Sequence, residues 1–235
     1  MPSFNRLLFP FTEITGFDKL ILDYIADDPY LSQFYPFSDD QEGIKKAIHL
    51  YKNPRLNRQN LKESLIRQYA KSGIAEIPEL VNENINSLLY AKTFTVTAGH
   101  QLNILGGPLY IIYKLISAIN LAEKLNKLIP SNHFVPVYWM ASEDHDIEEI
   151  SSVNFFGKKF KWENSWKGIS GKMPLDNLEK VIQEITQTFG NSDYAEEIST
   201  LISKSYLTSS NLSDATRKWV NNLLGKYGLI IIDAN

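Results

Sequence analysis

The chain has 235 residues, of which 43% are hydrophobic and 22% are charged. This is enough to bury the core of one large α/β domain or two small ones. The chain has 24 Lys and Arg and 27 Asp and Glu, which gives a net charge of −3. No broad electrostatic attraction to nucleic acid is therefore expected. The absence of cysteine excludes disulfides, thiolate zinc ligands and a cysteine nucleophile within this chain.

Neither the N-terminus nor any internal stretch indicates a membrane protein. The first residues lack a charged segment followed by an apolar one, so no signal peptide is predicted. The longest apolar stretch, at 108–128, is interrupted by Lys114, Asn120, Glu123 and Lys124. A membrane span needs about 20 mostly apolar residues. We therefore expect a cytoplasmic protein that does not contact a membrane.

Residues 1–92 carry helical patterns and predict an N-terminal helical segment that packs on the rest of the chain. Side chains suited to helix capping, and prolines suited to a first helical turn, mark where these helices begin. We expect helices at 16–26, from Pro29 with Asp28 as cap, after Asp40 to about Tyr51, after Asn57 and from Pro78.

A change of pattern at residue 93 marks the start of an α/β core at 93–235. Residues 93–97 are rich in β-branched and aromatic side chains, and 134–140 form a nearly continuous apolar run, so both predict strands. Pro108 opens the helix between them. Strand, helix and strand predict adjacent parallel strands with a right-handed crossover. The helix is expected to bury Leu109, Ile112, Leu115, Ile116, Ile119, Ala122 and Leu125.

The remaining residues predict a small β-hairpin insert, three helices and a final strand. The hairpin is expected at about 151–168 and the strand at 229–233, with Gly228 ending the last helix. The helices are expected at 176–189, 194–206 and 213–227. A parallel strand normally leads into a covering helix, so a chain that stops after Asn235 is expected to be truncated or half of a split gene.

Two loops should hold the ligand, because ligands bind outside the carboxyl ends of the strands in open α/β sheets. In the first loop, two glycines allow close approach to the backbone, and the helix after Pro108 offers free N–H groups to an anion. Amides and an imidazole add donors. The alternative is a glycine-lined turn without a ligand. The candidate residues are Gly99, His100, Gln101, Asn103, Gly106 and Gly107.

The second loop, at 142–146, is rich in titratable groups. Ser142, Glu143, Asp144, His145 and Asp146 follow one another directly after the apolar strand. Such groups serve in acid–base catalysis or hold a substrate ammonium. The alternative is a solvated acidic turn, with Asp146 capping a helix and Glu149 completing a capping box. A metal held by the 144–146 residues and His100 is disfavoured, because adjacent residues seldom all face one ion. No metal is predicted.

The hairpin carries three lysines next to two tryptophans. They are Lys158, Lys159, Lys161, Trp162 and Trp166. These lysines suit an acidic substrate, and a solvated hairpin face is the alternative.

The two loops resemble a known family. Three segments carry the likeness: Thr-Ala-Gly-His-Gln-Leu-Asn at 97–103, Gly-Gly-Pro-Leu-Tyr-Ile-Ile-Tyr-Lys at 106–114, and the stretch at 135–150 that ends Ser-Glu-Asp-His-Asp-Ile-Glu-Glu-Ile. They closely resemble the cysteine ligase family of bacillithiol biosynthesis (BshC), and Asn-Arg-Gln-Asn-Leu at 57–61 is also similar to it. The resemblance implies a Rossmann-like parallel sheet that adds cysteine to glucosaminyl malate. It also implies a second half with a coiled coil that mediates dimerisation.

Roles follow from fitting the candidate residues to amide formation, which needs an activated carboxyl group, a proton acceptor and oxyanion stabilisation. His100 and the helix start suit an oxyanion or a phosphate of ATP, while hairpin lysines suit malate. Asp144, His145 and Asp146 suit the cysteine ammonium or the amine proton. The other candidates, Gly99, Gln101, Asn103, Gly106, Gly107, Ser142 and Glu143, are expected to bind substrate or nucleotide. Two alternatives stay open: a nucleotidyltransferase-like enzyme that activates a small carboxylic acid, and a non-catalytic half of a split enzyme.

Overall fold

The computed structural model describes residues 7–51, 56–74 and 76–235, which fall into two compact units, 1–54 and 55–235. The first unit contains α1 (Lys19–Ile25) and α2 (Gln41–Tyr51). The carboxylate of Asp18 caps α1 by accepting a hydrogen bond from the Leu20 N–H (2.8 Å). The helix expected from Pro29 is wrong: this segment makes only successive turns, because its backbone bonds close after three residues.

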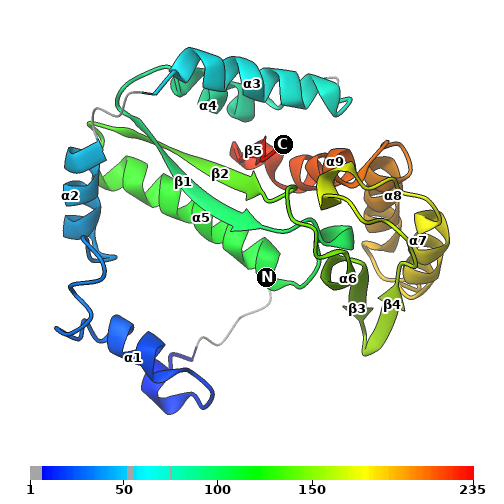
Figure 1. Cartoon of the computed structure of the whole chain (residues 1–235), viewed down its shortest axis with the longest axis horizontal. Coiled ribbons are helices and arrows are strands. Elements are labelled where there is room, and N and C mark those ends of the chain that lie inside the picture. The colour runs from blue at the N-terminus through cyan, green and yellow to red at the C-terminus, as the bar shows by residue number, and fades with distance from the viewer. Residues whose placement is uncertain (1–6, 52–55, 75) are drawn as a thin grey trace. The chain divides into compact units, whose positions relative to one another are not determined.

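The second unit is built on a three-stranded parallel sheet in the order β1-β2-β5 (Figure 1). Its strands are β1 (Thr93–His100), β2 (His133–Met140) and β5 (Ile230–Asp233). The predicted adjacency of the first two strands is confirmed, with Thr93 opposite His133 and His100 opposite Met140. β1 runs three residues beyond its expected end because it pairs with β2 throughout, so His100 lies at a strand end and not within a loop.

The connecting helix α5 (Tyr110–Leu128) runs along β1 and β2 (Figure 1). Its buried stripe is Ile111, Leu115, Ala118, Ile119, Ala122 and Leu125. Two predicted core residues are wrong, because Leu109 is 66% exposed and Ile116 is 37% exposed. The reason is that the helix starts at Tyr110, two residues after Pro108, and turns the stripe centred on Leu115 toward the sheet.

Two helices before the sheet begin where the capping residues predicted, and they pack against β5. Asn57 caps α3 (Arg58–Lys71), and Pro78 precedes α4 (Glu79–Ser87). The Tyr69 hydroxyl of α3 accepts a hydrogen bond from the Ile231 N–H (3.0 Å). The Asn84 amide of α4 donates to the Gly228 carbonyl (2.8 Å). These bonds fix both helices to the strand and to the turn before it.

The expected hairpin and helices are all present between β2 and β5. A short α6 (Ile147–Ile150) leads into the hairpin of β3 (Ser152–Phe155) and β4 (Lys158–Lys161). The helices α7 (Leu178–Gln187), α8 (Ala195–Tyr206) and α9 (Leu212–Leu224) follow. Gly228 has a left-handed φ of 75° after the last turn, as predicted for a residue that ends a helix.

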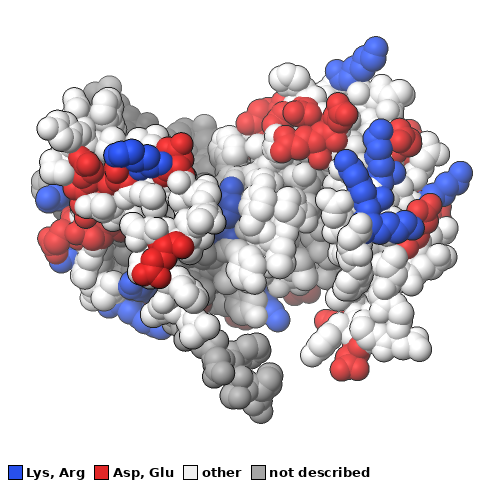
Figure 2. Space-filling model, turned by 90° about the horizontal axis from the view of Figure 1, so that it is seen from below, with Lys and Arg blue, Asp and Glu red and all other residues white. Residues whose placement is uncertain are grey.

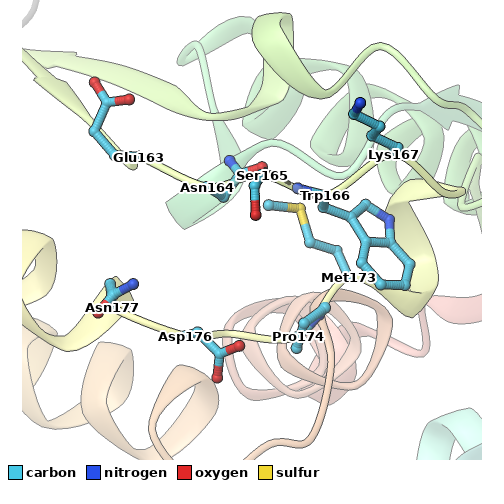
Figure 3. A pocket seen from close by; sticks show the side chains of 9 residues that line it. All are labelled: Glu163, Asn164, Ser165, Trp166, Lys167, Met173, Pro174, Asp176 and Asn177. Carbon is cyan, nitrogen blue, oxygen red and sulfur yellow. Dashed lines mark hydrogen bonds between the residues drawn. The ribbon is translucent and has the colours of Figure 1, made fainter.

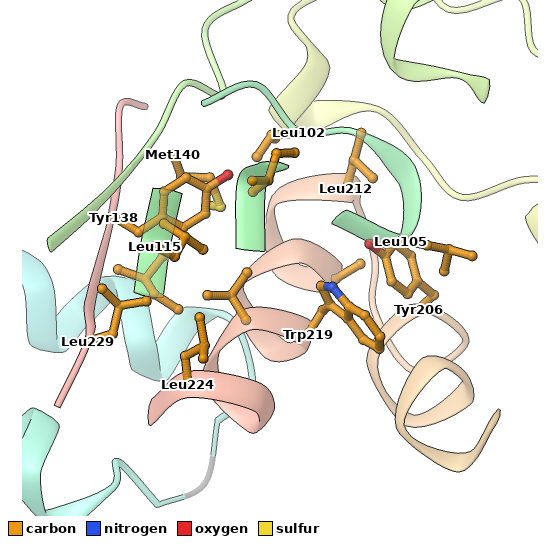
Figure 4. Close-up of a cluster of buried hydrophobic side chains, with 14 of the residues drawn as sticks. Leu102, Leu105, Leu115, Tyr138, Met140, Tyr206, Leu212, Trp219, Leu224 and Leu229 are labelled. Atoms are coloured by element: carbon orange, nitrogen blue, oxygen red, sulfur yellow. The ribbon is translucent and has the colours of Figure 1, made fainter. Parts of the chain in front are cut away.

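One hydrophobic cluster unites the second unit (Figure 4). It includes Tyr138 and Met140 of β2, Leu224 of α9, and Leu102 and Leu105 from the loop after β1. The loop that carries candidate site residues is therefore anchored in the core. Within the described residues, no helix combines the length and the apolar character that crossing a bilayer requires.

Candidate functional site

The two candidate loops begin side by side at the carboxyl edge of the sheet. His100 and Met140 are register partners at the ends of β1 and β2. Ala141, which follows Met140 and leads into the second loop, donates its N–H to the His100 carbonyl (3.0 Å). The Tyr138 hydroxyl also contacts this carbonyl (3.3 Å). The sheet thus brings together residues that are about 40 positions apart in the chain.

Gln101 joins the two loops directly. Its side-chain amide donates to the Asp144 carboxylate (2.6 Å) and, more weakly, to the Glu149 carboxylate (3.3 Å). The bond from Gln101 lowers the pKa of Asp144, and the Asp146 N–H adds to this effect. Both donors stabilise the charged form of the carboxyl group. Asp144 is therefore held as a carboxylate in a fixed position.

His100 is half-buried, and its surroundings disfavour the charged form of its ring. Its ring meets the ring of Tyr110 edge-on, with centroids 5.3 Å apart, and its Nε2 is buried without a hydrogen-bond partner among the described residues. Burial lowers the pKa of His100, and the nearby Lys114 ammonium lowers it further, while Glu149 and Asn103 oppose this. Lys114 is itself fixed by donating to the Gly99 carbonyl (2.8 Å).

The glycines of the first loop are required by the packing of the protein itself. Leu105, Gly106 and Gly107 have successive positive φ angles of 54°, 82° and 64°. A Cβ on Gly107 would lie 2.5 Å from the Cβ of Asn103, which is buried. A Cβ on Gly106 would lie 2.9 Å from the Trp219 indole nitrogen. The packing of the turn therefore explains why both residues are glycine, and no ligand is needed for that explanation.

Ser142 is fully buried and holds the second loop to the end of the sheet. Its hydroxyl donates to the Asp233 carboxylate at the end of β5 and accepts from the Asn235 amide (2.6 Å). Its carbonyl accepts the Gly171 N–H (2.9 Å). These contacts use the side chain inside the protein, so its position supports an anchoring role and gives no support to the predicted contact with substrate.

The other residues of the second loop face outward. Glu143, His145 and Asp146 are exposed. The Asp146 carboxylate caps α6 by accepting the Glu149 N–H (3.2 Å), which is the capping contact that the alternative interpretation predicts. The His145 ring makes no hydrogen bond to protein among the described residues, so the acids beside it do not fix its orientation.

The second loop keeps its negative charge. Within the described residues, no ion pair neutralises Glu143, Asp146 or Glu148. Figure 2 shows how acidic side chains gather in patches on one face, with basic side chains beside them. Such a surface favours a cationic group. In the part of the chain that the structure describes, no three histidine or acidic side chains gather closely enough to hold a metal ion.

Sequence reasoning missed a buried polar network next to this site. Arg217 of α9 is 1% exposed and donates to the Ile231 carbonyl (2.6 Å) and to the Gln68 side chain (3.1 Å). Its guanidinium lies over the Tyr69 ring and 4.0 Å from the Asp233 carboxylate. Burial raises the pKa of Tyr69 to about 12. The only signal in the sequence was an aspartate at the end of the last strand.

Three cavities of the described residues have linings that include neither His100 nor Asp144. One of about 480 Å³ lies between 163–167 and 173–177, after the hairpin (Figure 3). Another of about 570 Å³ lies at the amino ends of β1 and β2, and a third of about 380 Å³ lies between α5 and α9. The candidate catalytic residues therefore form an open edge of the sheet and do not line these cavities.

Comparison with known proteins identifies the family. Residues 9–235 match the family described as "Bacillithiol biosynthesis BshC, N-terminal Rossmann-like domain". The chain belongs to this family. The resemblance seen in the two loops is thereby confirmed, as is the α/β class with a Rossmann-like parallel sheet and a small antiparallel hairpin.

Relatives named "Putative cysteine ligase BshC" match almost the whole chain. The relative from Flavobacterium psychrophilum is 44% identical over 223 residues, which are 93% of this chain and 41% of that protein. That from Christiangramia forsetii is 41% identical over 240 residues, 100% of this chain and 44% of that protein. That from Bacillus cytotoxicus is 27% identical over 221 residues. The chain thus spans about two fifths of the length of these BshC relatives.

Proposed function

We propose that this BshC-family chain forms the Rossmann-like part of an enzyme that joins cysteine to glucosaminyl malate by an amide bond. Membership of the family supports the pathway. The single observation that carries the site is the Gln101 bridge to Asp144, because it links the two motif loops at the carboxyl edge of the sheet (2.6 Å). Ligands of open α/β sheets bind at this edge.

The proposed reaction forms one C–N bond. The glucosamine nitrogen attacks the activated carboxyl carbon of cysteine, the activating group leaves with the electron pair of its bond, and a base takes the proton from the nitrogen. ATP is the proposed source of activation. The roles required are an ammonium site for cysteine, a base and a donor for the developing oxyanion.

The residues fit these roles as follows. The unneutralised acids around Asp144 attract the cysteine ammonium. His145 is exposed beside them and free to take the amine proton. His100, whose pKa is lowered by burial, is a neutral imidazole at pH 7 and can donate one hydrogen bond to an oxyanion or phosphate. The first turn of α5 offers N–H groups close to His100 through Tyr110.

The direct test is an assay of thiol product from glucosaminyl malate, cysteine and ATP. It uses this chain alone and this chain combined with the remaining part of the F. psychrophilum relative. We expect product in the combined sample and at least tenfold less after Gln101→Ala. The matched control is Gln183→Ala, which removes an exposed glutamine whose side-chain amide donates to Glu179 on α7. Consumption of ATP with a carboxylic acid but without amide product would favour the nucleotidyltransferase-like alternative. No product and no ATP consumption would contradict both.

A further inference from the structure

The cavity after the hairpin has the size and lining of a small-molecule site. Its volume of about 480 Å³ falls within the range of about 300–1,000 Å³ that is typical of ligand pockets. Apolar side chains and polar ones meet in it (Figure 3). The apolar ones are Trp166, Met173 and Pro174, and the polar ones include Ser165, Asp176 and Asn177.

The indole of Trp166 is held in one orientation. Its Nε1 donates to the Ile169 carbonyl (3.0 Å), and its backbone N–H donates to the Asn164 side chain (3.2 Å). Gly168 lies against the ring, since a Cβ there would be 2.7 Å from Cζ2. Fixing the ring before a ligand arrives reduces the entropy lost on binding. Trp166 therefore offers a preorganised aromatic surface.

Three polar side chains of the cavity have no hydrogen-bond partner among the described residues. Among the described residues, the side chains of Ser165, Asp176 and Asn177 make no hydrogen bond, although the main chain of Asp176 is fixed by the Trp162 indole (2.8 Å). The Lys167 ammonium makes no ion pair there either. A hydroxyl, an amide and a carboxylate beside an indole suit a ring with several hydroxyl groups and an apolar C–H face, and the ammonium suits an anionic substituent on it.

The wall of this cavity is bonded to the acidic loop. Ile169, which accepts the Trp166 bond, is followed by Ser170, whose N–H donates to the Asp144 carbonyl (2.6 Å). The next N–H, that of Gly171, donates to the Ser142 carbonyl (2.9 Å). A Cβ on Gly171 would lie 2.7 Å from the Ser142 Cβ, so a glycine is needed for this close approach. The segment 169–171 thus connects the wall of the cavity to the proposed reaction edge.

We infer that this cavity binds the sugar ring of the acceptor substrate, with Trp166 against the ring and Asp176 and Asn177 bonded to its hydroxyls. Lys167 takes the anionic group that the ring carries. The inference rests on the proposed function, because that function requires an anionic glycoside as acceptor. The cavity at the amino ends of the strands is at the opposite edge of the sheet, and the one between α5 and α9 is mainly apolar.

The test is calorimetric titration with three probes: glucosaminyl malate, methyl glucoside and malate. We expect glucosaminyl malate to bind this chain. Asp176→Ala should raise its Kd at least tenfold, and Trp166→Phe should raise it at least threefold. Asn177→Gly removes the amide and suits the left-handed backbone of that residue (φ 62°), so it should weaken binding without unfolding. Asp193→Ala, at an exposed position whose side chain makes no ion pair among the described residues, is the matched control and should leave Kd within twofold.

The outcomes separate the two proposals. Unchanged affinity for glucosaminyl malate in the Asp176 and Trp166 variants, with normal melting temperatures, would overturn the cavity assignment and leave the proposed function standing. Binding of methyl glucoside that depends on Asp176, without binding of the malyl glycoside, would support a sugar site and contradict the proposed function. A wild-type chain that binds none of the three probes would overturn both.

Discussion

The loop after β1 and the loop after β2 are built in opposite ways, although both carry the motif residues of the family. The first is anchored by Leu102 and Ile104, which are fully buried, and Asn103 and Trp219 leave no room for a Cβ on its glycines. The second exposes Glu143 and His145, and the hydrogen bonds that hold it come from residues outside the loop. The first loop is therefore scaffold that presents His100 and Gln101, while the second supplies exposed charge.

This difference teaches that motif residues divide between those that hold the loops in place and those that are exposed. Ser142 and Asp146 stand within the most acidic motif of the chain, yet one is buried against Asp233 and the other caps α6. A substitution should therefore reduce stability or activity, according to which loop and which contact it removes. The following predictions test that division, from the largest expected effect to the smallest.

Replacing His145 by alanine should give the largest loss of activity without a loss of stability. General acid–base groups contribute about 100- to 10,000-fold in rate, and the exposed ring has no hydrogen bond to lose among the described residues. Turnover is measured on this chain combined with the remaining part of the family protein, and melting by calorimetry. His133→Ala, at the other end of β2, is the control. A loss below threefold would transfer the catalytic assignment to His100.

Gly107→Val should give the largest loss of stability. The variant places a β-branched side chain at φ 64° and a Cβ at 2.5 Å from the Cβ of Asn103, which together should cost about 3–5 kcal/mol. The measurement is urea unfolding. Gly190→Val isolates the backbone strain, because Gly190 has a similar φ of 56° and nothing within 4 Å of its ideal Cβ. Equal losses in both variants would show that the contact with Asn103 contributes nothing.

Gln101→Glu should uncouple the two loops. A carboxylate facing Asp144 and Glu149 replaces two hydrogen bonds by repulsion, and this raises the pKa of Asp144. We expect a loss of about 1–2 kcal/mol in the free energy of unfolding at neutral pH that becomes smaller as the pH falls. Gln59→Glu, on the exposed face of α3 beside Glu63, is the control for surface repulsion. A loss that does not depend on pH would contradict this account.

Acid should reduce the stability of the fold through protonation of His100. Because burial lowers the pKa of His100 below its ordinary value of 6.5, the unfolded chain binds the proton more readily, and stability falls as the pH drops below about 6.5. The lowered pKa of Asp144 acts in the same direction at lower pH. Melting temperatures between pH 5.5 and 7.5 should fall less in His100→Gln than in wild type. If the melting temperatures of the variant and the wild type depend on pH in the same way, the titrating group is not His100.

Local patterns in the sequence determined most of the elements of the second unit. Asn57 and Pro78 placed two helices, and the apolar run at 134–140 placed the central strand, because capping and burial act over a few residues. The same patterns and the family motifs located both loops at the carboxyl edge of the sheet. The turns after Pro29 and the exposed Leu109 were missed, since neither is fixed by propensity.

Only the tertiary structure decided which candidate residues meet and which are used for packing. Gln101 reaches Asp144 across 43 positions because parallel pairing aligns the ends of β1 and β2. The burial of Arg217 against Tyr69 and Gln68 depends on three elements converging, and no local pattern encodes it. Long-range contacts arise from the packing of whole elements, so the sequence named the candidate residues while the fold separated those that anchor the loops from those that are exposed.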